Sequence, residues 1–327
     1  MLLLLTPFTS TWLPTIRSIL QPHFPWILWT IIAFMLISEW PKGSDRAPSG
    51  LRRWWEGWRS LVAGLATFFL SGLLGFVVLY RSPVPVTVGY QGLLPAFVGL
   101  FAVPWVLQNL LAHTEIPPQH FARSVDAGAS ELVRGTLSGA LGGLFAAFFP
   151  MVTAGIGGLL AGHATAQRDE RLFIISQGAS KVVYYVGGFL FFFAPGLQRV
   201  KGGMAAMIST IYSGTSPQIY LLAVAAVVLT GVLAFFLSLG LTRVLIALLR
   251  RVHYRWISLG TLLILVAVVL GMTGPAGLLI CAVATGIGLI PVLWGSRRMN
   301  CMGVLLLPIA LNMVGAGDVI AGWLGLL

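Results

Sequence analysis

Lys181 lies deep inside an apolar run of the sequence, residues 172–194. An ammonium at mid-membrane depth costs roughly 2.5–3.5 kcal/mol on insertion scales, so it normally faces a protein interior or a water-filled cavity. Gln177 and Tyr184 share its helix face, and Ser180 is its direct neighbour. A cation, an amide and a phenol on one stripe suit a carboxylate or a phosphate, so substrate binding is expected here. The alternative is a structural lysine that snorkels to the interface or pairs with an acid.

A second polar candidate, Asp318, lies in the apolar run 301–325 near the end of the chain. A carboxyl group in a low-dielectric environment has a raised pKa, so Asp318 is a candidate for coupling transport to protons or ions. Asn312 is a weaker polar partner for it. The alternative places Asp318 at the outer membrane surface, where it carries no coupling role.

Enzymatic and metal chemistry find no support in the residues. Cys281 and Cys301 have no CxxC spacing and no clustered histidines. The sequence holds no Ser-His-Asp set, Walker motif, GxGxxG after a strand or HExxH. His163 is interpreted as an interfacial residue with satisfied hydrogen bonds rather than a proton relay. We therefore expect no catalytic residue, cofactor or metal, and a protein that is not an enzyme.

The stretch 139–164, GALGGLFAAFFPMVTAGIGGLLAGHA, is apolar yet contains seven glycines and a proline. Non-helical backbone at membrane depth is tolerated only where protein or a water-filled cavity shields it. A broken helix there exposes a half-helix N-terminus, which attracts anions. The alternative is that the glycines only permit close helix packing. The break is assigned to Gly139, Gly143 and Pro150, and the candidate substrate-binding residues after it are Thr153, Gly155, Gly157 and Gly158.

Composition defines the class of protein. The chain is 57% hydrophobic and 9% charged, with a mean hydropathy of +0.93, whereas soluble domains carry about 25% charged residues. Several continuous apolar runs approach the ~20 residues that cross a bilayer. The prediction is an all-α, polytopic integral membrane protein. Its net charge of +11 comes from arginines in short loops, which indicates contact with lipid headgroups and no nucleic acid.

The apolar runs predict eight transmembrane helices, and 135–165 adds an element that is either a full crossing or a re-entrant hairpin. An N-terminal segment, 1–59, holds the first helix and a basic, Trp-rich loop, and a permease domain occupies 60–327. The predicted spans are 24–40, 60–80, 91–112, 172–196, 218–242, 256–273, 275–294 and 301–325.

The positions of Lys and Arg decide how 135–165 meets the membrane. If this element returns to the side it entered, fifteen basic residues lie on the cytoplasmic side and four lie outside. A full crossing reverses every later loop. The sequence therefore favours a re-entrant hairpin with Pro150 near its tip, in a multi-pass protein of the prokaryotic plasma membrane. The loops expected in the cytoplasm include 41–59, 165–171, 243–255 and 295–300.

Five motifs, by their order and spacing along the chain, resemble the TctA-like permeases, which form the large membrane subunit of tripartite tricarboxylate transporters. The similarity covers roughly residues 60–311 and is nearest to the short, mainly archaeal branch. The motifs are GALGGLFAAFFPMVTAGIGG (139–158), RDERLFIISQGASK (168–181), GLQRVKGGMAAMI (196–208), LLPAFVGLFAVPWVL (93–107) and RRMNCMGVLLLPIAL (297–311).

The resemblance implies inverted repeats and glycine/proline-rich re-entrant elements. It places Gly178, Ser180 and Lys181 in the helix after the glycine/proline element. The family's first such repeat has no match before residue 25, so we expect the chain to lack it and to act as a homodimer or with a small membrane subunit. The family's Pro-Gly pair is Pro150-Met151 here.

Three functions remain open from the sequence. The first is a secondary transporter for an organic anion, in particular a carboxylate. The second is a translocase for a lipid-linked phosphate such as polyprenyl phosphate, and the third is a non-transporting or half-length membrane component. The expected partners are a small anionic substrate or lipid phosphate and the membrane lipids.

Overall fold

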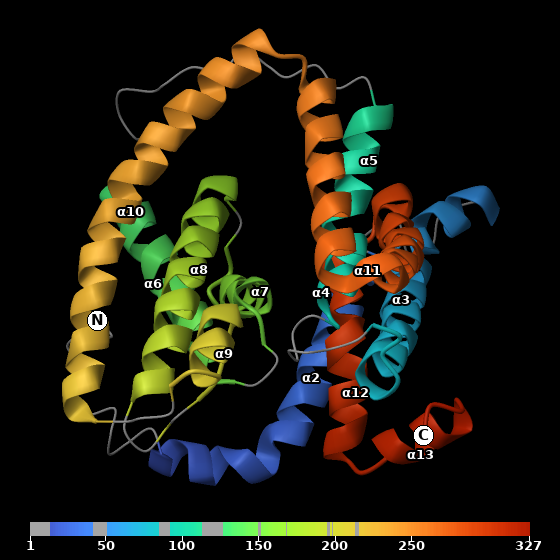
Figure 1. Cartoon of the computed structure of the whole chain (residues 1–327), viewed down its shortest axis with the longest axis horizontal. Coiled ribbons are helices and arrows are strands. Elements are labelled where there is room, and N and C mark those ends of the chain that lie inside the picture. Colours follow the sequence, from blue (N-terminus) through green and yellow to red (C-terminus); the bar gives the residue numbers. More distant parts are fainter. Residues whose placement is uncertain are drawn as a thin grey trace. The chain divides into compact units, whose positions relative to one another are not determined.

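The computed structural model is built from helices (Figure 1). It describes residues 14–41, 51–84, 92–112, 127–149, 152–167, 169–194, 197, 199–212 and 216–327. Every regular element in these ranges is helical, which confirms the predicted all-α class. Packing divides the chain into two units. Unit 1 contains Met1–Phe24 and His120–Ala247, and unit 2 contains Pro25–Gln119 and Leu248–Leu327.

Unit 1 is organised around three helices: α6 (Ala129–Phe148), α7 (Ala154–Ala164) and α8 (Glu170–Phe193) (Figure 1). The short elements η1 (Gln21–His23) and α9 (Gly203–Ser209) and most of α10 (Pro217–Arg251) complete it. Its core gathers the phenylalanines at the end of α8 with the end of α6 and the start of α10.

Local signals in the sequence start two of these helices. The Glu131 carboxylate accepts a hydrogen bond from the Gly128 N–H at 3.0 Å, which caps the first turn of α6. Asp169 does the same for α8 by accepting from the Arg171 N–H at 3.0 Å. Acidic side chains at these positions also suit the positive end of the helix dipole.

The structure contains a helical hairpin where the sequence predicts a re-entrant one, and its return to the cytoplasmic side stays a prediction. α6 ends at Phe148, and α7 begins at Ala154 and runs back along it. Near the start of α7, the glycines 142 and 157 face each other. At its end, the Thr165 hydroxyl lies 3.0 Å from the Ser138 hydroxyl in the middle of α6. The chain therefore reverses between residues 149 and 153, and Pro150, the predicted tip, lies outside the described residues.

In unit 2, α3 (Leu51–Tyr80) and the long helix α11 (Tyr254–Trp294) pack on each other and on several of the shorter elements (Figure 1). One core cluster joins α3 and α11 to α4 (Leu94–Phe97), the π-helical turn η3 (Val98–Ala102) and α12 (Gly303–Met313), and a second joins α5 (Val103–Leu111) to α11. The predicted boundary between residues 59 and 60 stays a prediction, and α3 runs across it. The other elements are α2 (Phe24–Ile37), η4 (Arg298–Met302) and α13 (Gly317–Trp323).

Five helices in the described ranges are long and apolar enough to cross a membrane: Pro14–Ile37, Trp54–Tyr80, Leu94–Leu111, Pro217–Leu249 and Tyr254–Trp294. A bent pair, Arg298–Met313 with Gly317–Trp323, raises the number to six if it forms one span. The chain bends by 115° between these two helices. The predicted span 172–196 corresponds to α8, which is not among these five. The predicted total of eight stays a prediction.

Helix α11 explains why the sequence indicated two spans in this region. It has 41 residues, but Gly274 inside it has φ +68° and ψ −169°, which no α-helix contains. Only glycine adopts this backbone conformation readily, and Pro275 follows directly. The predicted boundary between the spans 256–273 and 275–294 coincides with this interruption.

Candidate functional site

The glycines of the broken stretch lie mostly at helix contacts. A β-carbon on Gly143 would sit 2.5 Å from the Ser180 carbonyl oxygen, and one on Gly139 would lie even closer to the Ser176 carbonyl oxygen. Glycine at these positions lets α6 lie directly on α8, as in small-xxx-small packing. The close-packing interpretation therefore accounts for Gly139 and Gly143.

The start of α7 faces both of its neighbours. A β-carbon on Gly158 would lie 2.6 Å from the Gln177 Nε2 atom of α8, and Gly157 packs on the Gly142 carbonyl of α6. Gly155 differs, because it is exposed and its nearest neighbour would be the Thr153 hydroxyl at 3.9 Å. Of the predicted binding glycines after the break, Gly155 alone borders open space.

Thr153 caps α7 at the break. Its side-chain oxygen accepts a hydrogen bond from the Ile156 N–H at 3.5 Å, and its backbone is extended at φ −88° and ψ 163°. Ser180 holds the same turn from α8, since its buried hydroxyl donates to the Ala154 carbonyl at 3.0 Å. Two predicted residues, Thr153 and Ser180, thus fix the N-terminal turn of α7 in place.

Lys181 is not part of this contact. Its side chain is exposed, whereas Ser180 beside it is fully buried. Gln177 is half-buried against Gly158, and Tyr184 is half-buried under another lysine, Lys201, whose Nζ lies 5.4 Å from the ring centroid. The structure brings Gln177 and Ser180 to α7 and leaves Lys181 on an open face. Its role in binding stays a prediction.

A group of positively charged side chains lies at the tip of the hairpin. The sequence predicts that these residues lie in loops on the outer side of the membrane. The Lys201 ammonium donates hydrogen bonds to the carbonyls of Ala146 and Phe149, in and just after the last turn of α6. A cation suits the negative end of a helix dipole, and these carbonyls lack helical partners. Lys201 therefore occupies the break between α6 and α7.

Arg199 and Arg17 complete this group, which we name the tip cations: Arg17, Arg199 and Lys201. The Arg199 guanidinium carbon lies 5.7 Å from the Phe24 ring centroid and 5.6 Å from that of Phe148. The Arg17 Nη1 donates to the Leu197 carbonyl at 3.0 Å. Aromatic faces stabilise cations, so these two phenylalanine rings stabilise positive charge beside the break.

Acidic side chains do not balance the tip cations within the described residues. Glu131, Asp169 and Glu170 are the described acids of unit 1, and all three lie at the opposite ends of α6 and α8. The Arg199 Nη1 atom is buried and has no hydrogen-bond partner among the described residues. A buried donor without a partner is costly, so this end of unit 1 suits an anionic ligand.

The pKa values of the tip cations reflect the same imbalance. Two of them, Arg199 and Lys201, lie in the segment between α8 and α9. Burial, followed by the positive charge of Arg199, lowers the pKa of Lys201 to about 7. Burial, followed by the charge of Arg17, lowers the pKa of Arg199 to about 10. An anion bound here would oppose both shifts, because it favours the charged forms.

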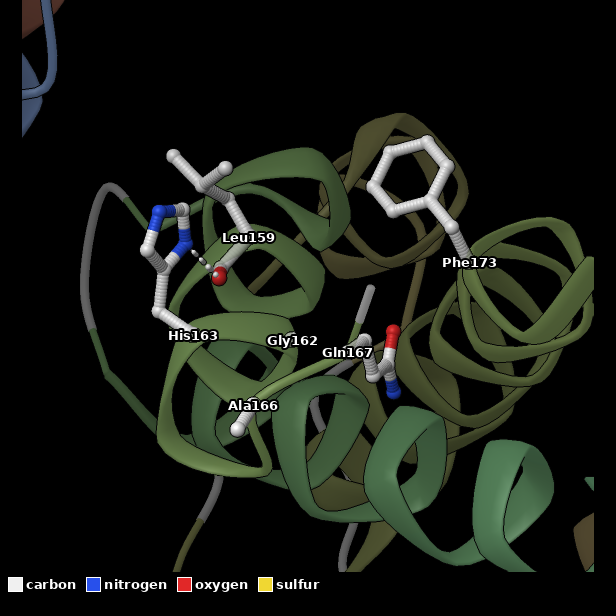
Figure 2. A pocket seen from close by; sticks show the side chains of 6 residues that line it. All are labelled: Leu159, Gly162, His163, Ala166, Gln167 and Phe173. Atoms are coloured by element: carbon white, nitrogen blue, oxygen red, sulfur yellow. Dashed lines mark hydrogen bonds between the residues drawn. The ribbon is translucent and has the colours of Figure 1, made fainter. Parts of the chain in front are cut away.

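A pocket of about 230 Å³ lies at the far end of α7 (Figure 2). Figure 2 shows His163, whose Nδ1 lies 2.9 Å from the Leu159 carbonyl, on one side of it. Gln167, on the other side, donates to the Ser138 hydroxyl at 2.8 Å and accepts from Ser176 at 3.0 Å. The pocket lies at the base of the hairpin. Its lining contains no Lys or Arg, so it offers no positive charge to an anion. The lining residues are Leu159, Gly162, His163, Ala166, Gln167 and Phe173.

The predicted coupling residue, Asp318, lies in unit 2. The Tyr80 hydroxyl lies 3.0 Å from the Asp318 carboxylate and 2.5 Å from the Asn312 side-chain oxygen. The predicted pairing of Asp318 with Asn312 thus runs through a tyrosine at the end of α3. Asp318 is exposed, and its coupling role stays a prediction.

Secondary transporters also contain interrupted helices, whose free ends bind substrates and ions. Comparison with known families agrees with the class: the model of the tripartite tricarboxylate transporter TctA family matches residues 1–303. The chain belongs to this family, and it is a membrane-embedded member of a transporter family rather than of an enzyme family.

A curated relative comes from Methanocaldococcus jannaschii, where it is described as an uncharacterized protein. It is 24% identical over 245 residues, which cover 73% of this chain and 58% of the relative. The match therefore spans little more than half the length of that relative. No solved structure matches the chain.

Proposed function

We propose that the protein is a permease for an organic anion, in particular a carboxylate with more than one negative charge. The observation that carries the proposal is the set of tip cations, three positive side chains beside a helix break without a described acid near them. The family's association with tricarboxylates supports the same substrate class.

The geometry suggests how residues on both sides of the break would bind the substrate. Thr153 and Ser180 hold the first turn of α7, whose N–H groups attract negative charge. The buried Nη1 of Arg199 provides a further donor. Arginine binds carboxylates through two parallel hydrogen bonds, which gives direction as well as strength. The residues proposed to hold the substrate are therefore Arg17, Arg199 and Lys201 with Thr153 and Gly155.

We also propose the orientation that the charge distribution favours. The hairpin enters and leaves on the cytoplasmic side of the plasma membrane, and the basic loops 41–59, 165–171, 243–255 and 295–300 lie on that side. A homodimer or a small membrane subunit is the expected partner. Accessibility of single cysteines introduced into these loops, labelled from either face of sealed vesicles, tests this arrangement.

Uptake of radiolabelled citrate into proteoliposomes tests the proposed function. We expect uptake by the wild-type protein and a loss of at least tenfold in the Arg199→Gln variant, because one charge-assisted hydrogen bond contributes about 1.5–3 kcal/mol. Arg81→Gln is the matched control, since Arg81 also bonds a carbonyl, that of Gly325 at 3.3 Å, but in unit 2. Absence of uptake by the wild type, or equal loss in both variants, would overturn the proposal.

A further inference from the structure

A second polar cluster is buried in unit 2, where α3 packs on η4. The Glu39 Oε1 accepts hydrogen bonds from the Arg297 N–H at 2.8 Å and from the Asn300 Nδ2 at 3.1 Å. Asn300 also donates to the Ser296 hydroxyl at 3.0 Å, and its own carbonyl lies 3.3 Å from the Ser71 hydroxyl of α3. These groups are largely hidden, since Glu39 is 7% exposed and Asn300 and Ser71 are 0% exposed.

Thr67 lies on the α3 face that meets Asn300. That face runs from Gly64, where a β-carbon would lie 2.8 Å from the Asn300 Nδ2, to Ser71. Thr67 falls between them at helical spacing, so it shares the face. We call the set Glu39, Thr67, Ser71 and Asn300 the oxygen cluster.

Two oxygen atoms of the cluster are buried without a partner among the described residues: the Thr67 Oγ1 and the Asn300 Oδ1. The Asn300 amide is held in this orientation by Glu39, because the reverse orientation would set two oxygens against each other. An unpaired buried oxygen costs about 1–3 kcal/mol, so each of these two oxygens is suited to accept a ligand.

Other threonines of the chain show that Thr67 is unusual. Thr230, Thr261 and Thr285 each donate to the carbonyl four residues earlier, at 2.7, 2.9 and 2.7 Å. This local bond is the common arrangement for threonine within a helix. The Thr67 hydroxyl does not form it, although the residue is 0% exposed. Its lone pairs therefore remain available to something else.

The cluster lies where a helix of membrane-spanning length meets an interrupted element. Thr67 is the central residue of the candidate span Trp54–Tyr80. Its partner Asn300 belongs to η4, a short 3₁₀ element that interrupts the helices between α11 and α12. Interrupted elements of transporters coordinate cations through oxygen atoms.

The charge of the cluster selects the ligand. Glu39 is its one carboxylate and takes part in no ion pair among the described residues; the Arg297 guanidinium instead donates to Ser38 at 2.8 Å. A buried carboxylate needs a compensating positive charge. One negative charge balances one positive charge, so the ligand is monovalent.

We propose that the oxygen cluster of Glu39, Thr67, Ser71 and Asn300 binds a small monovalent cation with the ligand chemistry of Na⁺. The carboxylate supplies the charge, and the two unpartnered oxygens with the Ser71 hydroxyl supply neutral ligands. This site lies within unit 2 and is independent of the anion site proposed in unit 1, so cation binding measured without transport tests it separately.

Titration of the purified full-length protein with NaCl tests this site, with KCl and choline chloride at equal ionic strength as comparisons. We expect Na⁺ to raise the thermal unfolding midpoint saturably, as a ligand that binds the folded state does. The Thr67→Val variant should weaken Na⁺ affinity about tenfold, and Glu39→Gln should abolish the response. Thr67→Val is the sharper variant, because it removes a hydroxyl that has no partner in the fold and leaves stability without Na⁺ intact.

The matched control is Thr273→Val, a buried threonine of α11 whose hydroxyl bonds Val269 at 2.6 Å. It should keep the wild-type affinity for Na⁺. Equal responses to Na⁺, K⁺ and choline in the wild type would overturn the proposal, and so would a Thr67→Val variant with unchanged Na⁺ affinity.

Discussion

The two units share a packing principle but carry opposite charge at their helix breaks. In unit 1, a β-carbon on Gly143 would lie 2.5 Å from a carbonyl of α8, and in unit 2 one on Gly288 would lie 2.5 Å from the Leu100 carbonyl. Beside the break in unit 1 lie three cations, whereas the interruption in unit 2 holds a carboxylate and neutral oxygens. Similar scaffolds thus present complementary chemistry.

The comparison also shows how a broken helix is stabilised inside a membrane protein. In unit 1, the Lys201 ammonium bonds the Phe149 carbonyl just after the end of α6. In unit 2, the Glu39 carboxylate accepts from the Arg297 N–H just before η4. Each break is held by the charge that matches the free backbone groups there. A group that stabilises the break also defines which ion the site attracts.

The largest expected effect is the loss of folding when a contact glycine is enlarged. Gly143→Val in unit 1 and Gly288→Val in unit 2 both drive a side chain into a backbone carbonyl, at a cost of several kcal/mol. Gly178→Ala is the control, since nothing lies within 4 Å of that position. Monodispersity and thermal unfolding in detergent measure the difference. Normal folding of Gly143→Val would show that the shared packing principle is wrong.

Removing the charged group at each break should lower the free energy of unfolding by less than the glycine substitutions do. The loss should also differ between the two units. Glu39→Ala leaves two donors, the Arg297 N–H and the Asn300 amide, buried without their acceptor, so we expect a loss of about 3 kcal/mol. Lys201→Ala also removes its own uncompensated charge, and we expect a loss of about 1 kcal/mol. Denaturant unfolding of both variants checks the order. A larger loss for Lys201→Ala would reverse the comparison.

Anion binding in unit 1 should weaken as pH rises through neutrality. The pKa of Lys201 is lowered to about 7, so its side chain is charged below that value and neutral above it. We expect citrate affinity to fall by severalfold between about pH 6 and pH 8. Calorimetric titration of wild type and Lys201→Met measures this, and the variant should lose this part of the dependence. An identical pH profile in both proteins would exclude Lys201 as the titrating group.

The smallest effect is expected at Lys181. Its side chain is exposed and lies outside the contacts that hold α7, so Lys181→Gln should change the free energy of unfolding by less than about 0.5 kcal/mol. Citrate binding by this variant separates the sequence prediction from the structure. A loss of citrate affinity equal to that of Arg199→Gln would show that Lys181 belongs to the binding site. It would also require a cavity on the open face of α8.

The hairpin could be predicted because it obeys a rule that spans the whole chain. The side of the membrane on which every later basic loop lies depends on whether 135–165 crosses it, so the sequence favours a chain reversal there. The structure shows that α7 returns along α6, and the side of the membrane stays a prediction. The break at Gly274 could also be predicted from the sequence, because a glycine followed by a proline interrupts an apolar run.

The cation groups could not be predicted because they depend on contacts between distant segments. Arg17 bonds Leu197 across 180 positions, and Glu39 bonds Asn300 across 261 positions. Periodicity indicates which residues share a face of one helix, but not which loop meets it. The sequence did hold one signal: Arg199 and Lys201 directly follow the helix that carries the predicted site.

Equilibrium binding of radiolabelled citrate to the purified protein, compared between Arg199→Gln and Arg81→Gln, tests the central claim most directly. The tip cations predict binding by the wild type and by Arg81→Gln, with affinity at least tenfold weaker in Arg199→Gln. Equal affinities in all three proteins would contradict the assignment of the anion site to the break in unit 1.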